Sequence, residues 1–155
     1  MTAAALGTIM LVEDQASDSL LVRRAFEKAG VQNPIQLVEH GDVALSYLEG
    51  IGEYENRTKY PLPIFILLDL KLPGMMGLQI LKWIRMRKEL RLIPVIVLTD
   101  SENESDVKAA YEAGANSFLR KPGNRGEVSR VIELIQRYWL EHNVVPQLVL
   151  RAKTD

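Results

Sequence analysis

Five side chains able to bind a cation or an anion, or to act as nucleophiles, follow apolar segments of this sequence. They are Glu13, Asp14, Asp69, Thr99 and Lys121. Each closes or directly follows a run of residues typical of a buried strand. In an open parallel sheet, functional side chains lie where the strands reach their carboxyl ends. We therefore expect three acids, a hydroxyl and an amine to form one site.

The segments that must position these side chains alternate between strand and helix patterns. The predicted strands are 8–12, 34–39, 64–68, 95–99 and 117–120, and the predicted helices are 17–29, 42–49, 77–88, 101–113 and 127–142. The alternation predicts parallel βαβ units with helices on both faces of one sheet. The expected fold is α/β, a doubly wound parallel sheet with strand order 2-1-3-4-5. Strands 1 and 3 are neighbours at the switch point of that order, so Glu13, Asp14 and Asp69 should meet there.

Short polar residues and glycines mark the ends of the predicted helices. Asp42 can cap the second helix, and Ser101 with Glu104 can form a capping box at the start of the fourth. Gly30 suits the left-handed end of the first helix. Segment 51–63 is polar, aromatic and punctuated by prolines, which is typical of a surface loop.

The composition excludes several kinds of protein. The 155 residues suffice for one stable domain, and 19 Lys and Arg against 20 Asp and Glu give a net charge of −1. No basic field therefore favours nucleic acid or an anionic membrane as a partner. The chain has no cysteine, which excludes disulfides and thiol chemistry. Residues 1–7 do not resemble a signal peptide, and no apolar stretch approaches the roughly 20 residues that span a bilayer, so we expect a cytoplasmic protein.

Three carboxylates that converge without a cation between them repel one another, so the acids are expected to bind a metal ion. Ligands that are all oxygen favour a hard ion, and a site with few protein ligands suits Mg²⁺ better than Ca²⁺. Beside that ion, Lys121 and Thr99 could contact phosphoryl oxygens. Asp69 is then the candidate nucleophile, which would form an aspartyl phosphate without a general base.

These residues, together with the motif Leu-Leu-Asp-Leu-Lys-Leu-Pro-Gly around Asp69 and the Lys-Pro pair at 121–122, resemble the receiver domain of two-component response regulators. The resemblance spans about residues 9–142 and implies a flavodoxin-like (βα)5 fold. It implies that Asp69 accepts a phosphoryl group from a histidine kinase. Asp14, Asp69 and the backbone carbonyl of Lys71 would bind Mg²⁺, with Glu13 contacting the metal chiefly through water.

The resemblance also implies a conformational switch and a signalling role. Thr99 and Lys121 would hold the phosphoryl oxygens, and Phe118 would change rotamer when Thr99 moves, shifting the population of two states. It implies a cis Lys121-Pro122 bond. The protein would then be a phosphoacceptor that catalyses its own phosphoryl transfer and dephosphorylation, and not an enzyme acting on other substrates.

A narrower resemblance links the chain to small receivers that serve cyanobacterial and bacterial phytochrome kinases. It rests on the insert 52–56 and on the Tyr-Trp-Leu-Glu ending of the last helix, residues 138–141. The segment Gly-Asn-Arg-Gly at 123–126 departs from the family, in which an apolar residue usually follows the proline, so the last helix should start atypically. We expect a flexible N-terminus at 1–7, a receiver domain at 8–143 and a tail at 144–155, with output through an unidentified downstream protein.

The same residues are also compatible with simpler roles. Asp14, Asp69 and Thr99 could each cap a local turn, and Lys71 could be a solvated loop residue or could alter the lifetime of the aspartyl phosphate. A receiver-fold adaptor that signals without phosphate is the alternative function. A phosphohydrolase is a third class, disfavoured because Lys71 stands where such enzymes carry a second acid.

The last predicted helix is more apolar than one buried stripe requires. Its aromatic residues Tyr138 and Trp139 and the apolar tail at 144–150 could pack against a second copy of the chain or fold onto their own domain. We expect a homodimer.

Overall fold

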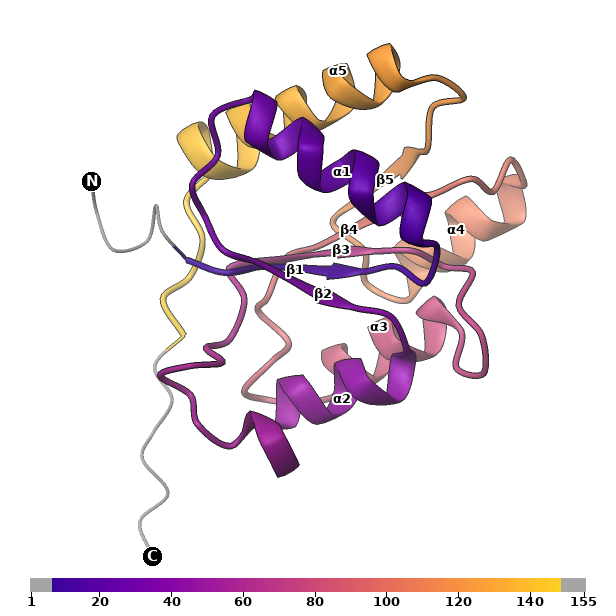
Figure 1. The fold of residues 1–155 in the computed structure, drawn as a ribbon. Helices are drawn as coiled ribbons and strands as arrows, with labels where there is room; N and C mark the ends of the chain where they lie inside the picture. The colour runs from indigo at the N-terminus through magenta and orange to yellow at the C-terminus, as the bar shows by residue number, and fades with distance from the viewer. Residues whose placement is uncertain (1–6, 149–155) are drawn as a thin grey trace, which may run out of the picture.

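The computed structural model describes residues 7–148 and contains one five-stranded parallel sheet. Its strands are β1 (Ile9–Val12), β2 (Ile35–Val38), β3 (Phe65–Leu68), β4 (Val95–Thr99) and β5 (Ser117–Arg120). The spatial order is β2-β1-β3-β4-β5 (Figure 1), so the predicted order is confirmed. Ile9 pairs with Ile35 on one side and with Phe65 on the other. This register places the ends of β1 and β3 next to each other.

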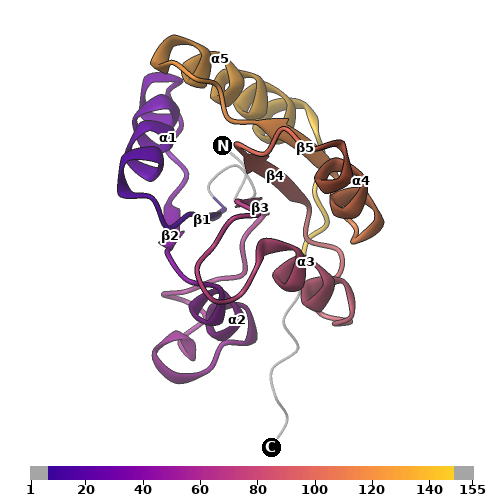
Figure 2. The same ribbon diagram turned by 90° about the vertical axis from the view of Figure 1, so that its right-hand side faces the viewer.

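Helices cover both faces of the sheet. They are α1 (Ala16–Lys28), α2 (Gly41–Glu49), the 3-10 turn η2 (Gly52–Tyr54), α3 (Gly77–Arg85), α4 (Glu104–Glu112), α5 (Arg125–Ile135) and the π-helical continuation η3 (Gln136–His142). Helices α1 and α5 lie on one face and α2 and α3 on the other (Figures 1 and 2). No helix within residues 7–148 is long and apolar enough to cross a membrane.

Alternating strand residues form two cores, as expected when both faces of a parallel sheet are covered. Met10, Ile66 and Leu68 belong to the cluster on the α2 and α3 face, whereas Leu11 and Leu67 belong to the cluster on the α1 and α5 face. All five side chains are at most 3% exposed. The sheet is therefore a rigid platform between two packed layers, and its strand ends have fixed positions.

Two of the predicted helix caps are wrong. Ser101 lies two residues before Asn103, the actual N-cap of α4, so it cannot form the predicted box with Glu104. Its hydroxyl instead donates to the carboxylate of Asp106. Helix α2 begins at Gly41, which places Asp42 inside the first turn, where a carboxylate interacts favourably with the helix dipole but does not cap it.

The ends of α3 and α5 also differ from the prediction. Helix α3 ends at Arg85, short of the predicted Lys88. Helix α5 begins at Arg125 because the side chain of Asn124 accepts the Glu127 N–H at 3.0 Å, which satisfies one free backbone donor. The described residues contain no cis peptide bond, so the implied cis bond before Pro122 is wrong for this structure.

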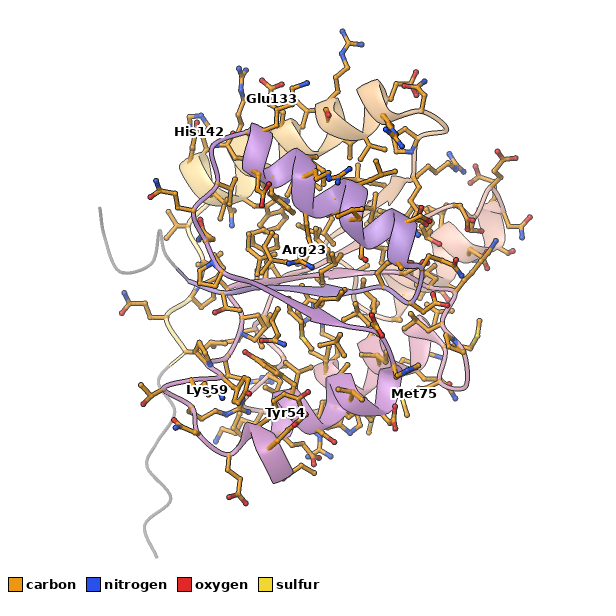
Figure 3. The ribbon with its side chains drawn as sticks, in the orientation of Figure 1. Arg23, Tyr54, Lys59, Met75, Glu133 and His142 are labelled. Atoms are coloured by element: carbon orange, nitrogen blue, oxygen red, sulfur yellow. The ribbon has the colours of Figure 1, made fainter. Side chains whose placement is uncertain are left out.

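The segment from 51 to 63 is mostly exposed, as predicted for a surface loop, and Arg57 and Tyr54 anchor it to the domain. Its Arg57 guanidinium donates to the carbonyl oxygens of Tyr47, Leu48 and Tyr60 at 2.7, 2.7 and 3.0 Å. Two of these carbonyls belong to the last turn of α2, where backbone acceptors lack helical partners. Tyr54, which is 9% exposed, packs between Tyr47 and Tyr60 on the α2 side of the sheet (Figure 3).

The segment that follows η3 returns to the opposite layer. It passes the sheet edge from the α5 side toward the α2 side (Figure 1), and Leu148 packs against the core of the α2 and α3 face. Trp139 packs on Phe65, with 6.1 Å between the ring centroids. These residues therefore contact their own domain. Most of the predicted N-terminus and the end of the predicted tail lie outside the described residues, and the domain limits stay predictions.

Candidate functional site

The predicted site residues come together at the carboxyl edge of the sheet. Asp69 follows β3, Glu13 and Asp14 follow β1, Thr99 closes β4 and Lys121 follows β5. One carboxylate oxygen from each of the three acids lies within 4.8 Å of the others. This convergence follows from the parallel pairing of β1 with β3.

Three donors hold the carboxylate of Asp69, which is 4% exposed. The Thr99 hydroxyl and the Lys71 backbone N–H each donate to its Oδ1 at 3.0 Å. The Lys121 ammonium lies 2.8 Å from its Oδ2. The carboxylate is therefore oriented on both oxygens, and its negative charge is compensated by hydrogen bonds and one cation.

Lys121 lies among the acids, so the cluster already contains one cation. Its Nζ is 2.6 Å from Oε2 of Glu13, 2.8 Å from Oδ2 of Asp69 and 2.9 Å from Oδ2 of Asp18. Burial lowers the pKa of Lys121, but the hydrogen bonds from its ammonium to these carboxylates outweigh burial and raise the pKa above its ordinary value. The amine is therefore a permanent cation in this site.

One ammonium does not neutralise the whole cluster. Burial raises the pKa of Glu13 to about 7, the contact with Lys121 opposes that rise, and the neighbouring Asp69 adds to it. The charged form of Glu13 is thus costly in this environment. A further cation would relieve the repulsion.

Within residues 7–148, the Asp14 carboxylate has one oxygen without a hydrogen-bond partner. Oδ1 of Asp14 is buried and accepts no hydrogen bond from the described residues. Buried carboxylate oxygens normally have a partner. An oxygen without one, beside two other acids and with no His or Cys among them, fits a hard divalent ion such as Mg²⁺.

Replacing Lys121 with alanine is expected to lower the free energy of unfolding by about 2 kcal/mol or more in metal-free buffer, because Glu13 and Asp69 lose the countercharge to two buried carboxylates. Urea unfolding measures this change. The control is Lys108→Ala, whose side chain is 80% exposed and 3.8 Å from Glu112. It should shift stability by less than about 0.5 kcal/mol. Equal losses in both variants would contradict the role of Lys121 as the internal countercharge.

The remaining predicted residues lie around or away from this cluster. The Lys71 ammonium pairs with Asp100 at 3.1 Å, with both side chains more than half exposed. Phe118 is half-buried against the core on the α2 and α3 face. Tyr138 and Trp139 are on η3 and take no part in the site. The rotamer change of Phe118 and the Lys71 carbonyl as a ligand stay predictions.

Two residues of the site were missed in the sequence. Asp18 is the acid in the first turn of α1, four residues after Asp14, and its place in the turn that follows the acidic pair is the signal that could have indicated it. Gly77 opens α3, where its N–H donates to the Leu70 carbonyl at 3.0 Å. A Cβ at Gly77 would lie 2.3 Å from the Asp69 carbonyl oxygen, so this glycine permits the close approach that fixes the Asp69 loop.

Fold and site together define a doubly wound α/β protein with a buried carboxylate held between a hydroxyl and an ammonium beside an acidic metal-binding group. The response regulator receiver domain model matches residues 9–133, and the chain belongs to this family. It is 38% identical to the response regulator Rcp1 of Synechocystis sp. over 138 residues, which are 89% of this chain and 92% of Rcp1.

Further relatives agree with this family. The chain is 40% identical to the probable methanogenesis regulatory protein FilR2 of Methanothrix harundinacea, over 89% of this chain and 86% of FilR2. The structure of the Mn²⁺-bound form of Rcp1 superposes with a TM-score of 0.84, covering 91% of this chain and 99% of Rcp1. The structure of the phosphorylated cyanobacterial phytochrome response regulator RcpA superposes with a TM-score of 0.85 at 33% sequence identity. The match covers 91% of this chain and 99% of the RcpA chain. The chain is thus a response regulator related to phytochrome response regulators.

Proposed function

We propose that this response regulator accepts a phosphoryl group on Asp69 from the phosphohistidine of a sensor histidine kinase, in a reaction that requires Mg²⁺. The observation that carries the proposal is the Asp69 carboxylate itself. It is buried, oriented by Thr99 and Lys121, and adjacent to an acidic group with an unpaired oxygen. A family member that signals without phosphate would not need all of these features.

The chemistry follows from the charges in the site. An Asp69 oxygen attacks phosphorus, the bond from phosphorus to the kinase imidazole nitrogen breaks, and that nitrogen keeps the electron pair. A carboxylate nucleophile has no proton to lose in the attack, so the chain needs no general base. Lys121 and Thr99 donate to the phosphoryl oxygens and orient them. A bound Mg²⁺, held by Asp14, Asp69 and the Lys71 carbonyl, would neutralise negative charge on the phosphoryl group.

Acetyl phosphate tests this proposal without a kinase. Intact mass after incubation should show one phosphoryl adduct in the presence of Mg²⁺ and none in a chelator. Hydroxylamine should remove the adduct, because an aspartyl phosphate is an acyl phosphate. A chain that stays unmodified while a known receiver is labelled in the same buffer would favour the phosphate-independent adaptor instead.

Replacing Asp14 with asparagine is expected to weaken Mg²⁺ binding at least about tenfold, because the variant loses a charged ligand oxygen. In metal-free buffer its stability should equal or exceed that of the parent, since one of several mutually repelling acids is gone. Calorimetric titration with Mg²⁺ and urea unfolding measure the two effects. The exposed Asp42→Asn is the control; it should leave the Mg²⁺ affinity unchanged and lower stability by no more than the helix-dipole contribution, about 0.3–1 kcal/mol. Parent-like Mg²⁺ affinity of Asp14→Asn would rule out this ligand.

The kinase partner is proposed to be a phytochrome. The support is the similarity to Rcp1 and to the phytochrome response regulator RcpA. Phosphotransfer from a panel of histidine kinases that includes a phytochrome tests this partner. Equal slow transfer from every kinase would contradict it. The downstream protein, the switch through Thr99 and Phe118, and a cytoplasmic location stay predictions.

The homodimer is proposed to form through η3 and the end of α5. The support is the exposure of Leu134 and Tyr138, which are 67% and 55% exposed despite their large apolar side chains. Trp139 is a poorer probe of this contact than Tyr138, because it also packs on Phe65 and its loss would disturb folding.

Replacing Tyr138 with serine is therefore expected to weaken self-association about tenfold or more, as loss of an aromatic anchor does. Sedimentation equilibrium over a range of concentrations measures it. Tyr111→Ser on α4 is the matched control, because Tyr111 is 51% exposed and lies on another helix. A loss of association in the control with none in Tyr138→Ser would move the contact to α4 and overturn this proposal.

A further inference from the structure

All three N–H bonds of the Lys121 ammonium are directed at carboxylates. The partners are Glu13 at 2.6 Å, Asp69 at 2.8 Å and Asp18 at 2.9 Å. An ammonium has three donors and no more. A phosphoryl oxygen that is to be bound by Lys121 must therefore displace one of these carboxylates.

Asp18 differs from the other two partners in its origin and exposure. Glu13 and Asp69 belong to the strand ends, and their side chains are 3% and 4% exposed. Asp18 comes from the first turn of α1, and its side chain is 38% exposed. Moving the Asp18 carboxylate into water costs less free energy than leaving the buried carboxylate of Glu13 or Asp69 without its ammonium partner. It is the partner that an incoming anion displaces first.

The surroundings of Asp18 offer its carboxylate little else to bind. Asp18 and Lys121 line a small open pocket between α1 and α5, whose remaining walls include Leu21, Val22 and Val131. These aliphatic side chains donate no hydrogen bond. Among residues 7–148, the Asp18 carboxylate accepts a hydrogen bond from Lys121, and the alternative to that contact is water.

We propose that Asp18 is a positioning residue that competes with the phosphoryl group for the Lys121 ammonium and so weakens binding of that group at Asp69. The inference rests on phosphoryl acceptance at Asp69. While the acceptor is unmodified, Asp18 occupies the third N–H of Lys121. When a phosphoryl group binds, its oxygen takes that N–H and the Asp18 side chain turns to solvent. The negative charge of Asp18 also opposes an incoming dianion.

The probe is the trifluoroberyllate anion, which coordinates a carboxylate oxygen in place of a phosphoryl group. Its affinity is measured by ¹⁹F NMR titration with Mg²⁺ present. Asp18→Asn should bind it about threefold to tenfold more tightly than the parent, because a charged competitor for a partly exposed ammonium is gone. Asp42→Asn, an exposed acid in the first turn of α2, is the control and should bind as the parent does.

A second measurement separates competition from a structural role. With acetyl phosphate as donor, Asp18→Asn should lower the half-saturating donor concentration by a similar factor, with little change in the maximal rate. Asp18→Ser serves in the same experiments if the asparagine variant does not fold. Unchanged or weaker binding in a folded Asp18 variant overturns the inference. A parent chain that neither binds trifluoroberyllate nor forms an acetyl phosphate adduct overturns the proposed function, and the inference with it.

Discussion

Asp69→Asn is expected to abolish the phosphoryl adduct formed with acetyl phosphate and Mg²⁺. An amide oxygen is a poor nucleophile, and it lacks the charge that the Lys121 ammonium and a metal ion would share with the reacting group. An asparagine side chain still offers an oxygen to the Thr99 hydroxyl and the Lys71 N–H, but its amide nitrogen would face the Lys121 ammonium in place of Oδ2, so urea unfolding must show that the variant is folded. Loss of the adduct would then report chemistry and not unfolding.

The control for this prediction is Asp100→Asn. Asp100 is an exposed carboxylate at the same edge of the sheet, where it pairs with Lys71, and it is an accessible competing acceptor near the site. Intact mass after long incubation should show the adduct in Asp100→Asn and none in Asp69→Asn. An adduct of equal yield in Asp69→Asn would mean that another carboxylate is the acceptor, and peptide mapping would identify it.

Gly77→Ala is expected to lower the free energy of unfolding by about 3 kcal/mol or more, as severe overpacking against backbone does. A Cβ at this position would lie 2.3 Å from the Asp69 carbonyl oxygen and 2.7 Å from the Leu70 Cα. Both are backbone atoms at the end of a buried strand, so neither can turn aside as a flexible side chain would. Inside a helix, alanine would otherwise be more stable than glycine by about 1 kcal/mol. A loss of stability in Gly77→Ala would therefore indicate the clash with the Asp69 loop.

Gly123→Ala is the matched control, because nothing lies within 4 Å of the Cβ that it would gain. It should change stability by less than about 0.5 kcal/mol in urea unfolding. If the Gly77→Ala chain folds, it should also be labelled more slowly by acetyl phosphate, because the clash moves the loop that carries Asp69. Parent-like stability of Gly77→Ala would show that the α3 start is not packed against the Asp69 loop as the structure has it.

Local pattern was sufficient to predict the fold and the principal acids. Strand and helix periodicity predicted the order of elements, and the topology rules for parallel sheets then brought Glu13, Asp14 and Asp69 to neighbouring strand ends. These predictions succeeded because each depends on residues near one another in the chain or on a strand pairing with few alternatives. At Ser101 and Asp42 the predicted N-cap was two residues away from the N-cap of the structure. Helix ends are the least certain part of a sequence pattern.

Only the tertiary structure decided which carboxylates the Lys121 ammonium contacts. The contact of Lys121 with Asp18 joins residues 103 positions apart, and its contact with Asp69 joins residues 52 apart. Neither is encoded in a local pattern, because a long lysine side chain can turn toward water or toward the acids, and only the packing of α1 and the loop after β5 fixes which. The sequence by itself determined the sheet, the edge at which the acids gather and the candidate acceptor. The folded chain determined that the Lys121 ammonium contacts three carboxylates and that Arg57 donates to the last carbonyls of α2. It also determined that position 77 has no room for a Cβ. Each of these depends on atoms brought together across the fold.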